Sequence, residues 1–497
     1  MRQNLSRRSF ISSAGACLGT ALIDCGAHAR DLRAYGKEHP QQSVSTTLQA
    51  VTRTLEINGK AATVMGVQQS SGTQGLVANV KQPFRVLLEN KLPVPTAIHW
   101  HGLHPPNNQD GVPGVTQPAI RPDSSTLYDF PLQPAGTHWM HSHSGLQEAF
   151  LLSAPLIVHD LSDHARDEQE VVLFLGDFSF TPPREIYAKL HSVRKSAMPG
   201  MNSRTAMPNS PKMADMKMGM GKPDANDWNY DAYLANDRTL NDPEVVRVER
   251  GGRVRLRIIN GSSGTNFFID LDALDGELIA TDGMPVCPVQ GSHFPLAIAQ
   301  RIDLRVQLPR EGGAFPILAL REGSREQTGI FLATKDAGIK RLPAEGSVGT
   351  GLLTLDLESR LVAVAPLIQR DIDQVHVLRL QGDMARYSWL INGDSFDVSN
   401  PGTQKPQIHV KPGQRVALKF VNETGMSHPM HLHGHSFQVI EINGRALNGA
   451  LRDTVLVPPN TSVTVAFDAN NPGLWYLHCH VLWHLAAGMA TLVQYDT

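Results

Sequence analysis

The sequence has 497 residues, of which 41% are hydrophobic and 19% are charged, with a formal net charge of −2. This composition is typical of a soluble globular protein and excludes a disordered or integral membrane chain. At roughly 100 to 200 residues per domain, the length predicts about three domains. There is no basic patch with interleaved aromatic residues and no second apolar run of bilayer length, so we expect neither a nucleic-acid partner nor a membrane span in the mature chain.

The first 29 residues are typical of a twin-arginine export signal. Residues 6–11 are SRRSFI, an uncharged stretch continues to Ile23, and residues 27–29 (AHA) form a cleavage site. We therefore expect residues 1–29 to be a signal peptide for the twin-arginine export machinery, and the mature protein to lie in the periplasm. A lipoprotein anchor at Cys17 is disfavoured, because residues 14–16 (AGA) lack the usual large aliphatic residue.

Cleavage after Ala29 would remove two of the four cysteines and leave Cys287 and Cys479. We therefore expect a large core, and not a disulfide framework, to stabilise the exported protein. Cys287 is interpreted as a buried core thiol.

Short runs of alternating apolar and polar residues dominate the sequence, for example residues 253–258 (RVRLRI). This period-two pattern predicts β-strands, so we expect an all-β protein. The candidate helices are few and short, at residues 184–193 and in the turn that follows His480.

Three internal repeats support the domain count. Residues 84–90, 253–260 and 415–422 are β-rich runs that each close on asparagine, and the segments 134–143 and 471–480 also resemble each other. We predict three Greek-key β-sandwich domains, at 45–165, 166–350 and 351–497.

Paired histidines follow the first and third repeats. Chance would place about one His-x-His pair in a chain with this histidine content, whereas this sequence contains five. Residues two apart in a strand point to one face, so each pair can present two imidazoles in one direction. The middle repeat is followed by residues 261–267 (GSSGTNF), so we expect no metal ligands there. Four pairs supply eight candidate ligands: His99, His101, His141, His143, His431, His433, His478 and His480.

Cys479 lies between His478 and His480 and should therefore point to the opposite face of its strand. There His428, His484 and Met489 can complete a set of two nitrogens, one thiolate and one thioether. That set is typical of a blue-copper electron-transfer site with a weak axial methionine. Histidines alone would also suit zinc, but a zinc interpretation leaves the cysteine and methionine unexplained.

The four motifs are similar to the copper-binding motifs of the multicopper oxidases, in the order found in that family. They are residues 99–102 (HWHG), 141–143 (HSH), 428–434 (HPMHLHG) and 478–489, which starts HCH. The resemblance covers nearly the whole mature chain and implies cupredoxin-like domains that reduce dioxygen to water. It also implies four copper ions: one type 1, one type 2 and two type 3.

The resemblance further implies a residue for each copper position. The type 1 copper would take His428, Cys479, His484 and Met489, and the type 2 copper would take His99 and His431. One type 3 copper would take His101, His141 and His480, and the other would take His143, His433 and His478. Electrons entering at the Cys479 sulfur would cross one backbone residue to His478 or His480. His104, His138 and His435 are interpreted as ordinary hydrogen-bonded residues.

Reduction of dioxygen consumes protons, so an acidic residue is expected near the cluster. Asp110 is the candidate, since residues 107–114 (NNQDGVPG) resemble the family segment that places a carboxylate behind the type 2 copper; it also suits an Asp-Gly turn. Leu485 stands where some bacterial relatives have an acidic residue, which puts a second proton route there in doubt.

Residues 198–220 hold seven of the fifteen methionines: Met198, Met201, Met207, Met213, Met216, Met218 and Met220. Thioether sulfur prefers Cu(I), so we interpret this insertion as a copper-collecting loop. The alternative is a low-complexity insertion without function. Together with Met426 and residues 145–148 (GLQE), the insertion makes the chain resemble the copper-resistance branch of the family.

We therefore expect a cuprous oxidase that accepts electrons from Cu(I) at the edge of His428 and His484. Glu423, close to Met426 in sequence, is a guess for a carboxylate that binds the substrate ion. The alternative substrate is a small phenol or aromatic amine, as for a laccase. A third hypothesis is a periplasmic protein that sequesters copper without turnover. A monomer is the family default.

Overall fold

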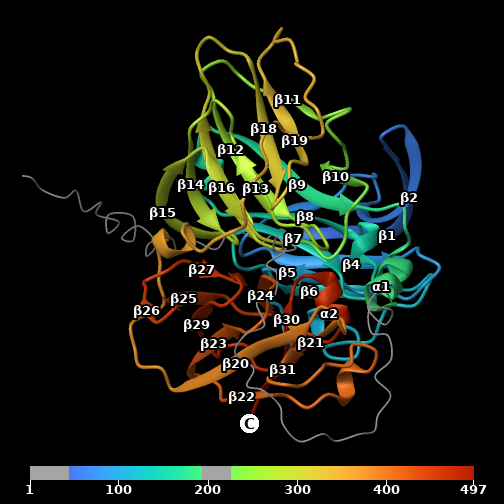
Figure 1. Cartoon of the computed structure of the whole chain (residues 1–497), viewed down its shortest axis with the longest axis vertical. Helices are drawn as coiled ribbons and strands as arrows, with labels where there is room; N and C mark the ends of the chain where they lie inside the picture. The colour runs from blue at the N-terminus through green and yellow to red at the C-terminus, as the bar shows by residue number, and fades with distance from the viewer. Residues whose placement is uncertain (1–43, 193–224, 497) are drawn as a thin grey trace, which may run out of the picture. The chain divides into compact units, whose positions relative to one another are not determined.

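The computed structural model describes residues 44–192 and 225–496, which form mainly β-strands (Figure 1). The expected signal peptide at 1–29 and the methionine-rich insertion at 198–220 lie outside the described residues. Within the described residues, no helix is both long enough and apolar enough to cross a membrane.

The first β-sandwich consists of two four-stranded sheets, with strand orders β2-β1-β4-β6 and β3-β8-β7-β5. Apolar residues of both sheets, such as Phe84, Trp100 and Leu156, form one buried core between them. The strands are β1 (Val44–Ile57), β2 (Lys60–Gln69), β3 (Leu76–Asn79), β4 (Pro83–Asn90), β5 (Ile98–His101), β6 (Ser125–Pro131), β7 (Gly136–Ser142) and β8 (Ser153–His159).

The middle β-sandwich has a six-stranded sheet, β10-β9-β12-β17-β14-β15, and a five-stranded sheet, β11-β19-β18-β13-β16. Its core includes Leu256, Phe267 and Leu304. The strands are β9 (Gln169–Phe178), β10 (Ala232–Ala235), β11 (Val245–Arg247), β12 (Arg253–Asn260), β13 (Phe267–Asp270), β14 (Gly276–Thr281), β15 (Met284–Gly291), β16 (His293–Leu296), β17 (Arg301–Gln307), β18 (Ala314–Arg321) and β19 (Gln327–Ala333).

The last β-sandwich has a seven-stranded sheet, β21-β20-β23-β29-β25-β26 with β27 on β25, and a five-stranded sheet, β22-β31-β30-β24-β28. The strands are β20 (Gln374–Asp383), β21 (Ser388–Ile391), β22 (Ile408–Val410), β23 (Arg415–Asn422), β24 (His428–Leu432), β25 (Phe437–Ile442), β26 (Arg445–Ala446), β27 (Leu451–Arg452), β28 (Thr454–Val457), β29 (Ser462–Asp468), β30 (Leu474–Cys479) and β31 (Ala490–Tyr495). The all-β fold class with three sandwiches is thus confirmed. The boundaries at 45–165, 166–350 and 351–497 stay a prediction.

Both predicted helices are present. They are α1 (Pro183–Ser192) and α2 (Leu482–Ala486). The 3-10 turns are η3 (Asn107–Gln109), η4 (Glu148–Phe150), η5 (Asp163–Ala165), η6 (Glu358–Arg360) and η7 (Pro401–Thr403). Two of these turns, η3 and η4, border the histidine pairs of the first sandwich.

The repeated asparagines have the same structural role in all three sandwiches. Asn90, Asn260 and Asn422 end β4, β12 and β23, and all three are buried. The side-chain amide of each donates to two main-chain carbonyls, and its oxygen accepts the N–H two residues later, at 2.7 to 3.2 Å. These bonds satisfy the turn that follows each strand, because buried main-chain groups need partners.

In the middle sandwich, the turn after Asn260 binds a carboxylate where the other two sandwiches have histidines. Asp177 accepts hydrogen bonds from the main chain of Ser263 and Gly264 and from the hydroxyls of Ser263 and Thr265, at 2.7 to 2.9 Å. None of these residues belongs to a histidine pair. The polar groups of this turn are therefore satisfied by Asp177.

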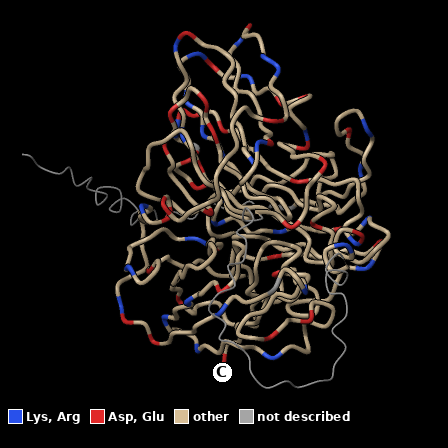
Figure 2. Tube along the Cα trace, viewed as in Figure 1, with Lys and Arg blue, Asp and Glu red and all other residues tan. Residues whose placement is uncertain are grey.

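Two surface features complete the fold. Cys287 on β15 is partly exposed, so its interpretation as a buried core thiol is wrong. β15 is the edge strand of its sheet, where side chains are less covered than in the centre, and the sequence pattern alone did not reveal this position. Basic and acidic residues are interspersed along the described trace, in keeping with the small net charge (Figure 2).

Candidate metal centre

Antiparallel pairing sets the histidine motifs side by side. In the first sandwich β5 pairs with β7, so that His99 lies opposite His141. In the last sandwich β24 pairs with β30, so that His431 lies opposite His478. Because alternate residues share a face of the sheet, each strand pair presents its histidines in one direction.

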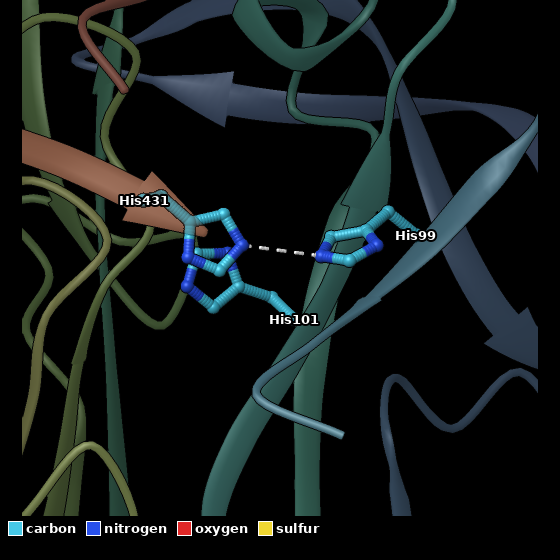
Figure 3. Close-up of side chains that lie close together, drawn as sticks. All are labelled: His99, His101 and His431. Carbon is cyan, nitrogen blue, oxygen red and sulfur yellow. Dashed lines mark hydrogen bonds between the residues drawn. The ribbon is translucent and has the colours of Figure 1, made fainter. Parts of the chain in front are cut away.

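The eight paired histidines meet between the first and last sandwiches. Figure 3 shows His431 of β24 directed at His99 of β5, with 3.4 Å between their Nε2 atoms, and stacked on His101. Potential ligand atoms lie within 4.8 Å of one another in three sets: His99, His101 and His431; His101, His141 and His480; and His143, His433 and His478.

Ring nitrogens converge at short distances inside these sets. The distance is 3.4 Å from His101 Nδ1 to His141 Nε2, 3.3 Å from His141 Nε2 to His480 Nε2, and 3.1 Å from His433 Nε2 to His478 Nε2. Seven of the eight residues are fully buried, and His143 is partly buried.

Burial keeps seven of the eight imidazoles neutral and able to bind a metal. It lowers the pKa of His478 to about 4. Burial first, and then repulsion from neighbouring groups, lowers the pKa of six more of them well below the usual range: His101, His141, His143, His431, His433 and His480. A buried group of neutral nitrogen donors fits a copper cluster.

Asp110 lies behind the cluster, as the sequence predicted. Its carboxylate is fully buried at the end of η3, with one oxygen 3.1 Å from His99 Nδ1 and the other 2.8 Å from His433 Nδ1. The main-chain carbonyl of Asp110 also lies 2.9 Å from His99 Nδ1. Asp110 thus fixes the Nδ1 atoms of two histidines, which point away from the cluster. Their Nε2 atoms are thereby oriented toward the other histidines.

Two further carboxylates at the cluster were missed by sequence reasoning. Glu148 on η4 lies 3.0 Å from His141 Nδ1 and 3.8 Å from His480 Nδ1, and burial raises its pKa well above the usual range. Asp453 lies 3.0 Å from His101 Nε2. Glu148 belongs to the GLQE run that signalled the family branch, but Asp453 lies outside every motif.

A second donor set surrounds Cys479 on the opposite face of β30. The Cys479 sulfur is 3.7 Å from His428 Nδ1 and 3.6 Å from His484 Nδ1, and these two nitrogens are 3.1 Å apart. Met489 is fully buried, and its carbonyl accepts the Cys479 N–H at 3.0 Å. His428, Cys479 and His484 form one group able to hold a metal ion, and Met489 as the thioether ligand of a blue-copper set stays a prediction.

The middle sandwich supports the helix that carries His484. In α2, Trp483 Nε1 donates to the Tyr230 hydroxyl at 2.9 Å, and the Leu482 N–H donates to the Ser263 carbonyl at 2.9 Å. Ser263 belongs to the turn that binds Asp177. Although this turn carries no paired histidine, it therefore fixes the position of a metal-ligand candidate.

The outward nitrogens of the Cys479 group also have protein partners. His428 Nε2 lies 2.7 Å from the Thr424 hydroxyl, and His484 Nε2 lies 3.1 Å from Asp227. The Asp227 side chain is 2% exposed. Sequence reasoning missed Asp227 because nothing in residues 225–230 (ANDWNY) signals proximity to a histidine some 250 positions later.

The remaining candidates take other positions. Met426 is buried next to Thr424, whose hydroxyl its N–H contacts at 3.2 Å. Glu423 forms an ion pair with Arg379 and accepts a hydrogen bond from Gln381 at 2.8 Å, so it does not face the Cys479 group. His104, His138 and His435 are each hydrogen-bonded to the protein, and among the described residues none of them belongs to a group able to hold a metal.

A cavity of about 230 Å³ lies beside the cluster. Its lining includes His143 and Glu148 from the first sandwich, Tyr187 from α1, and Leu482 and Leu485 from α2. It therefore gives a small molecule a space directly beside a cluster histidine.

Three consecutive parts of the chain, residues 49–163, 169–341 and 369–497, match family models that are each described as multicopper oxidase. The multicopper oxidase MmcO of Mycobacterium tuberculosis is 32% identical over 518 residues, covering 99% of this chain and 97% of the relative. The chain belongs to the multicopper oxidase family. This multicopper oxidase is therefore an oxidoreductase, and its buried histidines fit the copper that the family name implies.

Other relatives of this multicopper oxidase differ in their assigned roles. Copper resistance protein A of Escherichia coli is 26% identical, covering 91% of this chain and 94% of the relative. Laccase-3 of Thanatephorus cucumeris is 28% identical, covering 90% and 92%. The fold matches a multi-copper oxidase from Pseudomonas thermotolerans with a TM-score of 0.67 at 24% identity, covering 92% of this chain and 100% of that one.

Proposed function

We propose that this multicopper oxidase transfers electrons one at a time from Cu(I) to dioxygen and reduces dioxygen to water with four electrons and four protons. The observation that carries the proposal is the position of Cys479, whose thiol faces one donor set while the adjacent His478 and His480 face the other. Four bound copper ions, one of type 1, one of type 2 and two of type 3, would supply the one-electron chemistry.

The residues around Cys479 provide the electron path. The sulfur of Cys479 would receive the electron, and a single peptide bond joins Cys479 to each flanking histidine. The Cys479 carbonyl lies 2.9 Å from His478 Nδ1, which adds a hydrogen-bonded contact to the covalent one. Such a short connection supports transfer between the two sites without a mobile carrier.

Asp110 is the proposed proton relay on the dioxygen side. Its carboxylate contacts His99 and His433, so it can pass protons toward the centre of the cluster without leaving its position. The cavity beside His143 supports entry of dioxygen and exit of water. Glu148 lines that cavity and is a second buried carboxylate at the same place.

Cu(I) is the preferred reductant because the outer edge of His484 carries a negative charge. Asp227 touches His484 Nε2, and a carboxylate at that position attracts a cation more than a neutral phenol. Asp227 also follows the methionine-rich insertion in sequence, whose thioethers suit Cu(I). The relatives named copper resistance protein A support the same substrate.

The alternative function is a laccase that oxidises phenols or aromatic amines at the same edge, and it is supported by the relatives named laccases. A copper-sequestering protein without turnover is a third candidate, which the complete donor sets disfavour. We further propose export by the twin-arginine route to the periplasm, where Cu(I) oxidation would serve copper tolerance, and a monomeric state.

Oxygen uptake by the copper-loaded protein, with Cu(I), Fe(II) and a phenol as reductants, tests this proposal. We expect a blue protein that consumes oxygen fastest with Cu(I). A colourless protein that binds Cu(I) without oxygen uptake would overturn the oxidase assignment, and faster uptake with the phenol would favour the laccase. Deleting residues 198–220 should slow Cu(I) oxidation and leave phenol oxidation unchanged, whereas unchanged Cu(I) turnover would refute the role of the insertion.

A further inference from the structure

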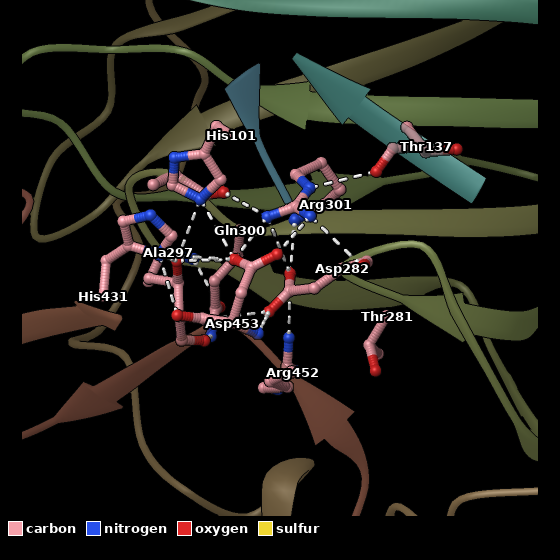
Figure 4. Close-up of polar contacts among 12 residues, drawn as sticks. His101, Thr137, Thr281, Asp282, Ala297, Gln300, Arg301, His431, Arg452 and Asp453 are labelled. Atoms are coloured by element: carbon pink, nitrogen blue, oxygen red, sulfur yellow. Dashed lines mark hydrogen bonds and ion pairs between the residues drawn. The ribbon is translucent and has the colours of Figure 1, made fainter. Parts of the chain in front are cut away.

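A buried arginine of the middle sandwich reaches both copper-ligand sandwiches. Arg301 begins β17, and its side chain is fully buried. Its Nε donates to the Thr137 carbonyl of β7 at 3.0 Å. Its two terminal nitrogens donate to the two oxygens of Asp453 at 2.7 and 2.5 Å. Figure 4 shows Arg301 between Thr137, Asp282 and Asp453.

Asp453 connects this arginine to two cluster histidines. One carboxylate oxygen lies 3.0 Å from His101 Nε2, and the main-chain carbonyl lies 2.8 Å from His431 Nδ1. These are the outward nitrogens, because His101 Nδ1 faces His141 and His431 Nε2 faces His99. Asp453 therefore fixes the ring orientation of one proposed type 3 ligand and one proposed type 2 ligand.

We propose that Arg301 is a positioning residue of the trinuclear copper site and acts through Asp453. Its paired charge holds the carboxylate so that the oxygen facing His101 accepts the Nε2–H. His101 is then locked in the tautomer whose Nδ1 lone pair is free for the metal. The middle sandwich, whose described residues form no metal-binding group, thereby becomes a required part of the cluster. This inference rests on the proposed trinuclear site.

The geometry requires arginine and not merely a positive charge. The planar guanidinium donates to both oxygens of Asp453 in a bidentate pair and still reaches the carbonyls of Thr137 and Asp282, the latter at 3.1 Å. A lysine ammonium cannot cover these separated acceptors. Because the pair is buried, loss of one partner leaves the other charge without compensation.

A second buried ion-pair network supports the pair of Arg301 and Asp453. Arg452 lies 3.3 Å from Asp282 and 2.8 Å from Glu358, and all three side chains are almost fully buried. Asp282 in turn accepts the Arg301 main-chain N–H at 2.9 Å. Arg301 and Asp453 are therefore held on both sides, as a positioning pair must be.

Arg257 of β12 provides a matched control. It is also fully buried, donates to the Thr137 hydroxyl at 3.0 Å, and forms ion pairs with Asp303 at 3.1 Å and Asp163 at 3.2 Å. Arg257 thus joins the middle sandwich to the first through the same threonine, without contacting Asp453. Its ion-pair partners Asp163, Glu170 and Asp303 contact none of the eight cluster histidines in the described part of the chain.

The test compares Arg301→Lys with Arg257→Lys in the full chain. Copper per chain, blue absorbance per chain and thermal unfolding of the copper-free protein are measured for each. We expect both variants to unfold at lower temperature. Arg301→Lys alone should bind the cluster coppers about 10- to 100-fold more weakly, while its blue absorbance stays at the wild-type level. Normal cluster copper in Arg301→Lys, or equal loss in Arg257→Lys, overturns the proposal.

Asp453→Asn and the double variant test whether Arg301 acts through Asp453. Asparagine keeps an oxygen toward His101 but loses the charge that pairs with Arg301. We expect selective loss of cluster copper in Asp453→Asn and a non-additive effect in the double variant; additive losses contradict the proposal. If Arg301→Lys does not fold, Asp453→Asn decides alone, and retained cluster copper refutes the role. Wild-type protein without cluster copper would instead refute the proposed function.

Discussion

His99 and His431 are 332 positions apart in the chain, yet their Nε2 atoms lie 3.4 Å apart. One residue belongs to the first sandwich and the other to the last, so the proposed type 2 site forms only when the two sandwiches pack against each other. A ligand shared between two folded units makes metal binding depend on their docking. Substitutions at this contact should therefore impair the cluster and leave the Cys479 site intact.

Replacing His431 by alanine should remove the cluster function and leave the blue site intact. His431 supplies one of the two proposed type 2 ligands, whereas Cys479 and its partners do not contact His431 through their side chains. We expect blue absorbance near the wild-type level and less copper per chain. Oxygen uptake should be slower by a factor of about 100 or more. His104→Gln is the control, because the His104 ring contacts the Ser436 hydroxyl and belongs to no metal-binding group in the described part of the chain. Wild-type oxygen uptake in His431→Ala would contradict the assignment.

Asp110→Asn should slow dioxygen reduction without blocking electron entry. The amide keeps an oxygen acceptor toward one histidine but carries no transferable acidic proton. Loss of a proton relay costs about 10²- to 10⁴-fold in rate. Stopped-flow absorbance should show that the reductant bleaches the blue colour at the wild-type rate, and that oxygen restores the colour slowly. A variant in which both rates are unchanged would exclude Asp110 as the relay.

Much of the site follows from local sequence patterns. The histidine pairs could be predicted because strand residues two apart share a face, and Cys479 because the residue between them takes the other face. The three asparagines marked the repeats because each ends an equivalent strand and satisfies the turn beyond it. These signals lie within a few residues of the groups that they position.

The residues that sequence reasoning missed act across long separations. His101 and Asp453 are 352 positions apart, and Arg301 and Asp453 are 152 apart. A lone Asp between two strands, or a lone Arg in a strand, has no sequence pattern that indicates its partner. The same limit explains the guess at Glu423, which is close to Met426 in sequence while its carboxylate pairs with Arg379.

Asp227→Asn should weaken oxidation of Cu(I) more than oxidation of a phenol. The substitution removes a negative charge beside His484 and keeps the side-chain shape. Loss of this one charge contact corresponds to roughly a 10-fold rise in KM for the cation, or ~1.4 kcal/mol. Steady-state oxygen uptake with each reductant measures the difference.

Glu423→Gln provides the comparison for Asp227→Asn, because it removes an acidic charge that is already paired with Arg379. We expect this variant to retain wild-type KM values for both reductants. Equal effects of the two substitutions on Cu(I) oxidation would show that overall charge, and not Asp227 itself, determines the preference.

His435 should make the copper-free protein less stable in acid. Burial lowers the pKa of His435 to about 4, and its Nε2 contacts the Tyr495 hydroxyl at 2.6 Å. Between pH 6.5 and 4 the unfolded chain therefore binds the extra proton, so the free energy of unfolding falls by about 1.4 kcal/mol per pH unit as the pH drops. Urea unfolding at pH 6.5 and 5 should show that His435→Phe loses roughly 1.6 kcal/mol less than the wild type over this interval. Every other histidine is common to both proteins, so equal losses would mean that His435 titrates alike in the folded and unfolded chains.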